Sequence, residues 1–109
     1  MSDEADEKAA TRAEDARRLA RHQRATDFRA VMDLPAGRRF VWRYLNELGV
    51  FSGSYAPGDA LATAYNEGRR AAGLQLQVEL QRLAAPQYVR MLTEAVQQVE
   101  LDAELLPEE

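Results

Sequence analysis

Three breaks divide this chain of 109 residues into four segments that favour helix. The first is Pro35, because proline disfavours helical backbone at the preceding residue and suits the first turn of a new helix. The second is the loop Val50–Gly58, where Gly, Ser and Pro cluster, and the third is Pro86. We therefore expect an all-α protein with helices at about 3–32, 35–48, 60–84 and 86–106.

Apolar residues recur at helical spacing in the last three segments. Gly49 suits the left-handed residue that follows a helix, and Phe51 would then fold back onto the last turn. Asp59 is a good N-cap for the third helix. The run 74–80 alternates as a strand does, but the chain offers no second strand to pair with it. The residues expected to pack helices together are Phe40, Tyr44, Leu45, Leu48, Phe51, Tyr65, Gly68 and Ala72.

The first segment is rich in Ala, Glu and Arg, which are good helix formers. Ser2 and the acids after it suit a helix start, and the last helix should end near Pro107. Only alanines line the apolar side of the first half. We expect a long helix whose early turns project or pack on a partner, followed by a compact three-helix core. The alternative is a frayed N-terminus up to about residue 12. Residues 1–25 would form a charged helical extension and residues 26–109 a small helical domain.

The residue types present remove most catalytic and metal chemistry. The sequence has no cysteine and one histidine, His22, which leaves no material for a disulfide framework, a Cys-based zinc site or the usual Ser-His pair. It contains no P-loop, dinucleotide fingerprint or nucleophile elbow. The acidic N-terminus is followed by no apolar run, so no signal peptide is expected. No window approaches the roughly 18 apolar residues of a membrane span. We expect no enzyme activity, no cofactor, no metal and no membrane association.

Charge is distributed unevenly along the chain, whose formal net charge is −4. Eight arginines and two aspartates lie between residues 17 and 43, and acids dominate both ends. Arg17, Arg21 and Arg24 share one helix face, where they would track phosphates. The alternative is a solvated face on which Glu14 and Asp15 supply local ion pairs.

A second basic cluster surrounds Trp42. Phosphate contact with aromatic stacking is one interpretation, and arginine stems that pack on aromatics and pair with acids are the other. Trp42 itself lies at the edge of the apolar face, where it would reach a partner subunit. The residues assigned to partner or phosphate contact are Arg17, Arg21, Arg24, Arg38, Arg39, Trp42 and Arg43.

Two motifs flank the central loop. "GRRFVWRYL" occupies residues 37–45, followed by "GVF" at 49–51, and "EGRRAAGL" occupies residues 67–74 after the pair Ser54–Tyr55. In this order they resemble a family of small proteins of tailed bacteriophages, typified by one from a Bordetella podophage, over roughly residues 26–95. The resemblance implies a phage protein, and the family has no assigned catalytic residues to transfer.

The expected function is therefore a non-enzymatic phage structural or morphogenesis protein. It would be a virion component, internal or associated with portal or capsid, that acts through helix-mediated assembly. Its expected partners are portal, core or capsid proteins and copies of itself. Its location would be the virion, or the host bacterial cytoplasm during assembly. Two alternatives stay open: a nucleic-acid-associated accessory protein that uses the Arg17–Arg43 stripe, and a transient scaffolding or assembly adaptor.

The paired arginines also predict a packing feature. A glycine precedes each pair, at Gly37 and at Gly68. We expect both glycines to allow close contact between the second and third helices, with one arginine of each pair directed outward.

Overall fold

The computed structural model describes residues 3–106. Within them the chain forms four helices and no strand, namely α1 (Asp3–Asp33), α2 (Pro35–Glu47), α3 (Ala60–Leu83) and α4 (Ala85–Leu105). The all-α expectation is confirmed, and each boundary lies within one residue of its expected place. Ser2 and Pro107, the expected start of the first helix and end of the last, lie outside the described residues.

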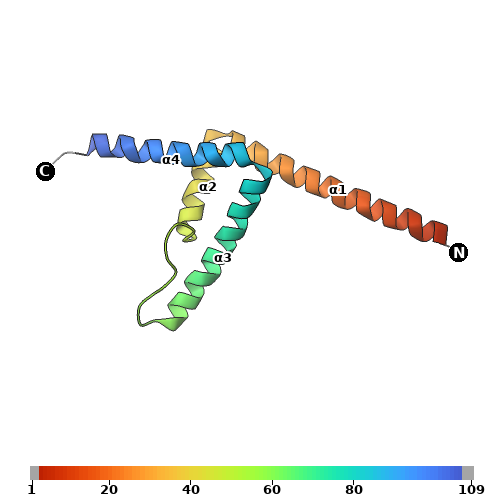
Figure 1. Cartoon of the computed structure of the whole chain (residues 1–109), viewed down its shortest axis with the longest axis horizontal. Helices are drawn as coiled ribbons and strands as arrows, with labels where there is room; N and C mark the ends of the chain where they lie inside the picture. Colours follow the sequence, from red (N-terminus) through yellow and green to blue (C-terminus); the bar gives the residue numbers. More distant parts are fainter. Residues whose placement is uncertain (1–2, 107–109) are drawn as a thin grey trace.

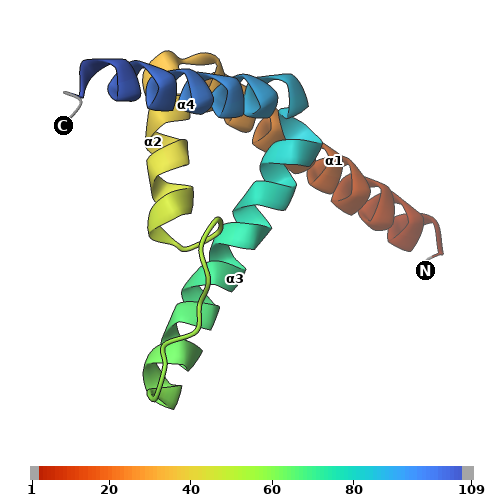
Figure 2. The same cartoon turned by 60° about the vertical axis from the view of Figure 1, so that its left-hand side comes forward.

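Two long helices point away from a shared centre. α1 and α4 extend in opposite directions, and α2 and α3 descend from the centre like the stem of a T (Figure 1). The turned view shows that α3 continues well past the end of α2 (Figure 2). The molecule measures 81 × 38 × 15 Å, and its radius of gyration is 20.6 Å, whereas a compact chain of this length has about 13 Å. Much of each long helix therefore lies away from the centre.

One small core joins all four helices. Its largest fully buried side chains are Met32 of α1, Leu45 of α2, Leu80 of α3 and Met91 of α4. Because each helix contributes one of them, no helix can leave without opening the core. The other buried hydrophobic residues are Val50, Ala84 and Tyr88, and partly buried neighbours are Phe28, Val41, Trp42, Leu74, Leu76 and Leu92.

Local chemistry sets the connection between α2 and α3 as the sequence predicts. Gly49 adopts the left-handed conformation with φ of 82°, and the Val50 amide donates to the Leu45 carbonyl oxygen at 3.1 Å. This is the hydrogen bond of a glycine-terminated helix. At the other end of the loop, the Asp59 carboxylate accepts from the Ala62 amide at 2.9 Å and caps α3.

The close approaches between helices lie elsewhere than expected. A Cβ on Gly68 would meet no described atom within 4 Å, so the expected contact at Gly68 is wrong. A Cβ on Gly73, five residues later, would lie 2.5 Å from Val50 Cγ2, because that is where the chain leaving α2 crosses α3. Gly37 does permit a close approach, but to α1: its Cβ would lie 1.9 Å from the Val31 carbonyl oxygen. The sharp turn at Pro35 folds α2 back onto the end of α1.

The expected packing residues divide into two groups. Leu45 is buried and Leu48 half-buried, and Phe51, although 46% exposed, folds back as predicted, with its ring centroid 5.0 Å from that of Trp42. The expectation is wrong for the remaining residues, which are exposed: Phe40, Tyr44, Tyr65, Gly68 and Ala72. Phe40, for example, is 62% exposed, since it lies on the side of α2 that faces away from the core. Tyr65, in the second turn of α3, is 66% exposed.

Candidate functional site

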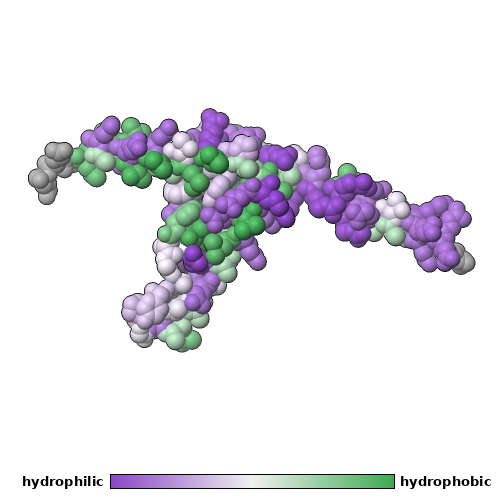
Figure 3. Space-filling model, viewed as in Figure 1, coloured by the Kyte–Doolittle hydropathy of each residue, from purple (hydrophilic) through white to green (hydrophobic). Residues whose placement is uncertain are grey.

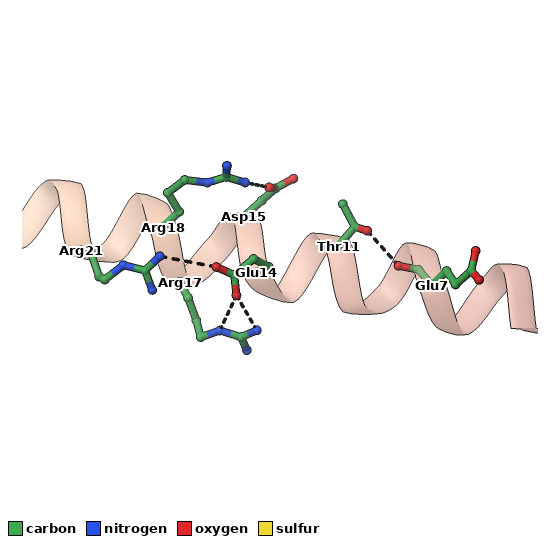
Figure 4. A network of polar contacts seen from close by, with 7 residues as sticks. All are labelled: Glu7, Thr11, Glu14, Asp15, Arg17, Arg18 and Arg21. Carbon is green, nitrogen blue, oxygen red and sulfur yellow. Dashed lines mark hydrogen bonds and ion pairs between the residues drawn. The ribbon is translucent and has the colours of Figure 1, made fainter.

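The arginines at the middle of α1 pair with carboxylates of their own helix. Arg17 and Arg21 both reach Glu14, at 2.9 and 3.5 Å, and Arg18 pairs with Asp15 (Figure 4). The hydrogen bond from Arg17, followed by that from Arg21, lowers the pKa of Glu14 below its ordinary value. The solvated, ion-paired alternative is confirmed on this face. All these side chains are exposed, so each pair contributes little to stability.

Arg24 and Arg29 connect α1 to α3 instead of facing outward to a ligand. Arg24 donates to the Glu79 carboxylate at 2.7 Å, and its guanidinium lies 5.4 Å from the centroid of the Phe28 ring. One turn later, Arg29 donates from Nε to the Leu83 carbonyl oxygen at 2.9 Å. The basic face of α1 therefore forms part of the contact between α1 and α3.

Arg38 is the one buried charged residue of the described chain, with 2% of its surface exposed. Its Nη1 donates to the carbonyl oxygens of Met32 at 2.9 Å and Asp33 at 3.1 Å, at the end of α1. Its Nε and Nη2 form a two-point contact with the Glu94 carboxylate of α4. This contact is the main cause that lowers the pKa of Glu94, and it raises the pKa of Arg38. The assignment of Arg38 to partner or phosphate contact is wrong, because its donors are already taken up inside the fold.

A third arginine, like Arg29 and Arg38, donates to a carbonyl oxygen at the end of another helix. Arg69 of α3 donates to the Glu47 carbonyl oxygen at 2.9 Å, at the end of α2. Arg29, Arg38 and Arg69 thus each close the carboxyl end of a different helix, where carbonyl groups lack intrahelical partners and the helix dipole is negative. The three contacts form a closed cycle: α1 caps α3, α3 caps α2, and α2 caps α1.

Around Trp42 the structure separates residues that the sequence groups together. Trp42 is half-buried and packs on Phe51 within the same chain, and its expected contact with a partner subunit stays a prediction. Arg39 and Arg43 are exposed, beside the stacked rings of Phe40 and Tyr44, whose centroids lie 6.3 Å apart. Arg39 points outward while Arg38 points inward, as expected for a pair. In the pair on α3, Arg69 is exposed and Arg70 is half-buried.

Several exposed apolar areas remain on the surface. The area along α4 is visible in Figure 3 as green side chains. On α2 the area is the Phe40–Tyr44 stack. At the free end of α3 it comprises Tyr55, Leu61 and Tyr65, and at the free end of α4 it comprises Val96, Val99, Leu101, Leu105 and Leu106. Faces of this kind mark protein interaction sites more often than reaction centres.

Residues 3–106 contain neither a metal-ligand cluster nor a membrane-spanning helix. No group of three His, Asp or Glu side chains in this range lies close enough together to hold a metal ion. No helix in the same range has the length and apolar character that crossing a bilayer requires.

Comparison with known proteins shows to which family the central part of the chain is similar. Residues 28–94 match the family model described as Bbp19-like phage protein, which confirms the resemblance read from the central motifs. No curated protein and no solved structure matches the chain. The match covers the last turns of α1, all of α2 and α3, and the first half of α4. The projecting parts of α1 and α4 lie outside it.

Proposed function

Because this chain belongs to the family of Bbp19-like phage proteins, we propose that it is a non-enzymatic structural or morphogenesis protein of a bacteriophage particle. It acts through packing of its exposed helix faces against other phage proteins. Family membership supplies the phage context. The surface of the chain supports the assembly role.

The amount of exposed surface carries the proposal. The chain exposes 8337 Å², whereas a compact monomer of 12.3 kDa exposes about 6,100 Å². The excess of about 2,200 Å² exceeds twice the roughly 800 Å² that one partner contributes to a standard protein interface. A chain with so small a core and so much uncovered helix is expected to gain stability when neighbours cover it.

The chemistry of the side chains supports the non-enzymatic part of the proposal. The sequence has no cysteine, and its one histidine, His22, is exposed on α1. The ionic pair of the buried Arg38 with the half-buried Glu94 holds α1, α2 and α4 together. These polar groups therefore have structural partners and are not aimed at a space where a substrate would lie.

The protein would be a virion component, located inside the particle or at its portal or capsid. Its partners would be portal, core or capsid proteins and further copies of itself, and it would occupy the host bacterial cytoplasm during assembly. Mass spectrometry of purified particles before and after genome ejection tests this. Presence in intact particles supports the proposal, and loss on ejection would indicate an internal position. Absence from every particle and every assembly intermediate would overturn it.

Mass spectrometry of assembly intermediates and a DNA-binding assay separate the alternatives. A transient scaffolding protein would be found in assembly intermediates and not in finished particles. A nucleic-acid-associated protein would bind DNA with an affinity that falls steeply as salt rises. The pairing of Arg17, Arg21 and Arg24 with carboxylates weighs against the second alternative. A gel shift that stays blank at low salt would remove it.

A further inference from the structure

The projecting part of α4 carries an apolar stripe with the spacing of a coiled-coil seam. Val89, Leu92, Val96, Val99 and Ala103 follow one another at alternating intervals of three and four residues. Of these five residues only Leu92 is half-buried against the core, whereas Val89 is 60% exposed and every residue from 96 to 106 is exposed. Val99, in the middle of the projecting part, is 68% exposed. Most of this apolar stripe, the α4 seam, is therefore not covered by the other helices of its own chain.

The projecting part of α1 presents a face of different character. Ala9, Ala13, Ala16 and Ala20 follow the same alternation, at intervals of four, three and four residues, and every residue from 3 to 24 is exposed. Alanines alone bury too little surface to form a core. They do allow the axis of a second helix to come close, so that larger side chains of that helix can fill the contact.

Charges beside the two seams are complementary. In the heptad pattern Arg12 and Arg17 flank the alanine face of α1, and Glu100 and Asp102 flank the seam of α4. Charges at these flanking positions set partner choice in coiled coils. Two α4 seams would bring acids together, and two α1 faces would bring arginines together. Only the mixed pair, α1 against α4, places opposite charges side by side. The exposed Arg17–Glu14 pair is weak enough to exchange partners.

The two seams cannot meet within one molecule, because α1 and α4 extend in opposite directions (Figure 1). Both helices run in the same direction along the long axis, however, with the amino end of α1 and the carboxyl end of α4 at opposite tips. A second copy displaced along this axis lays its α1 beside the α4 of the first, and the two helices are parallel.

We propose that residues 3–24 of one copy pack in parallel against residues 95–105 of the next copy, in a head-to-tail contact that deepens the assembly role proposed above. The contact uses a different surface from each of the two copies. Each copy in a dimer therefore keeps one projecting helix part free, here called an arm: residues 3–24 of α1 in one copy and residues 95–105 of α4 in the other. Such contacts propagate, and they form a ring where the rotation closes or a filament where it does not. Because both arms lie outside the matched residues 28–94, the contact belongs to this chain's own extensions.

Sedimentation velocity of the full-length protein over a concentration series tests the proposal. The wild type is expected to form species larger than a dimer. Val99→Glu blocks the α4 seam, and Ala16→Glu blocks the α1 face. Each variant alone should associate at least about a hundredfold more weakly, because a carboxylate would be buried without a partner. An equimolar mixture should form a one-to-one complex and stop there, since the first variant keeps its α1 arm and the second keeps its α4 arm.

Matched controls add the same charge on the opposite sides of the same helices. Leu101→Glu and Thr11→Glu should assemble as the wild type does, and circular dichroism should show equal helix content in all five proteins. Self-association of Ala16→Glu to a dimer would overturn the proposal in favour of an α4–α4 contact. A wild type that stays monomeric would also overturn it. In that case, detection of the protein in purified particles would leave the proposed function standing, and absence from particles and intermediates would remove both.

Discussion

Gly68→Ala should stabilise the fold, whereas Gly73→Ala should leave its stability unchanged or lower it. Both glycines lie in the interior of α3, and both substitutions add one methyl group. Alanine favours helix over glycine by about 1 kcal/mol at such positions. At Gly68 no described atom lies within 4 Å of the new Cβ, so no packing cost reduces the gain in helix stability. Gly68→Ala should raise the free energy of unfolding by about 1 kcal/mol, and the melting temperature by about 4–8 °C.

At Gly73 the same gain in helix stability is opposed by the cost of a steric clash. The new Cβ would lie 2.5 Å from Val50 Cγ2 and 3.0 Å from Leu48 Cβ. Val50 is buried and β-branched, so it cannot swing aside without moving backbone. Extra methyl groups in packed sites cost about 1–3 kcal/mol. Because the helix gain is common to both variants, the difference between their unfolding free energies should equal this packing cost, about 1–3 kcal/mol.

Urea unfolding followed by circular dichroism at low protein concentration measures both values. The substitutions should also be made in a chain that carries Val99→Glu, so that self-association does not contribute to the apparent stability. Equal stabilisation by the two alanines would show that Val50 and Leu48 do not pack against α3 at Gly73. A destabilised Gly68→Ala would mean that another helix covers Gly68, as the sequence alone suggested.

Three other perturbations test separate parts of the structure. The pKa of Glu94 is lowered, so its pairing with Arg38 stabilises the fold above the ordinary carboxyl pKa of 4.5, and this stabilisation is lost as pH falls below that value. Acid unfolding of Glu94→Gln should therefore show a shallower pH dependence in this range. An unchanged profile would contradict the pairing. Leu45→Ala removes the α2 side chain at the centre of the core and should lower the free energy of unfolding by about 2–5 kcal/mol in a urea titration; a loss below 1 kcal/mol would contradict its burial. Phe51→Ala should shift the fluorescence of Trp42, the one tryptophan of the chain, to longer wavelength, because the ring that shields it is removed; an unchanged spectrum would place Phe51 elsewhere.

Those features that depend on neighbouring residues in the sequence were predictable. Pro35, Gly49 and Asp59 each act through their own backbone or the next turn, so they locate helix ends without knowledge of the tertiary fold. The same holds for the ion pairs of Arg17 and Arg21 with Glu14, which lie within two turns of one helix. The family match likewise follows motifs that are continuous in sequence.

The exposed and buried sides of each helix were harder to predict, because a helical period gives a face but not the neighbour that covers it. On α2 the apolar residues span a wide arc, and only the part centred on Leu45 meets other helices. Phe40 and Tyr44, at the edge of that arc, remain exposed. Arg38 does lie on the covered side, three residues before Val41 and seven before Leu45. That spacing was the available signal for its burial, but Glu94 lies on another helix and no local pattern links the two.

The cycle of arginine caps gives the arginine-rich centre of this chain a structural explanation. Neither α1 nor α2 has a basic residue in its last turn, so the cation that lies at each of these helix ends comes from another helix. A guanidinium suits this task better than an ammonium group, because its planar set of five donors can serve carbonyls and a carboxylate at once. Arg38 does so with Met32, Asp33 and Glu94. In a chain whose apolar core is this small, directional contacts of this kind fix the angles between helices. The contact of Arg38 with Glu94 ties α4 to the same centre, from which both projecting helices of the proposed head-to-tail contact extend (Figure 1).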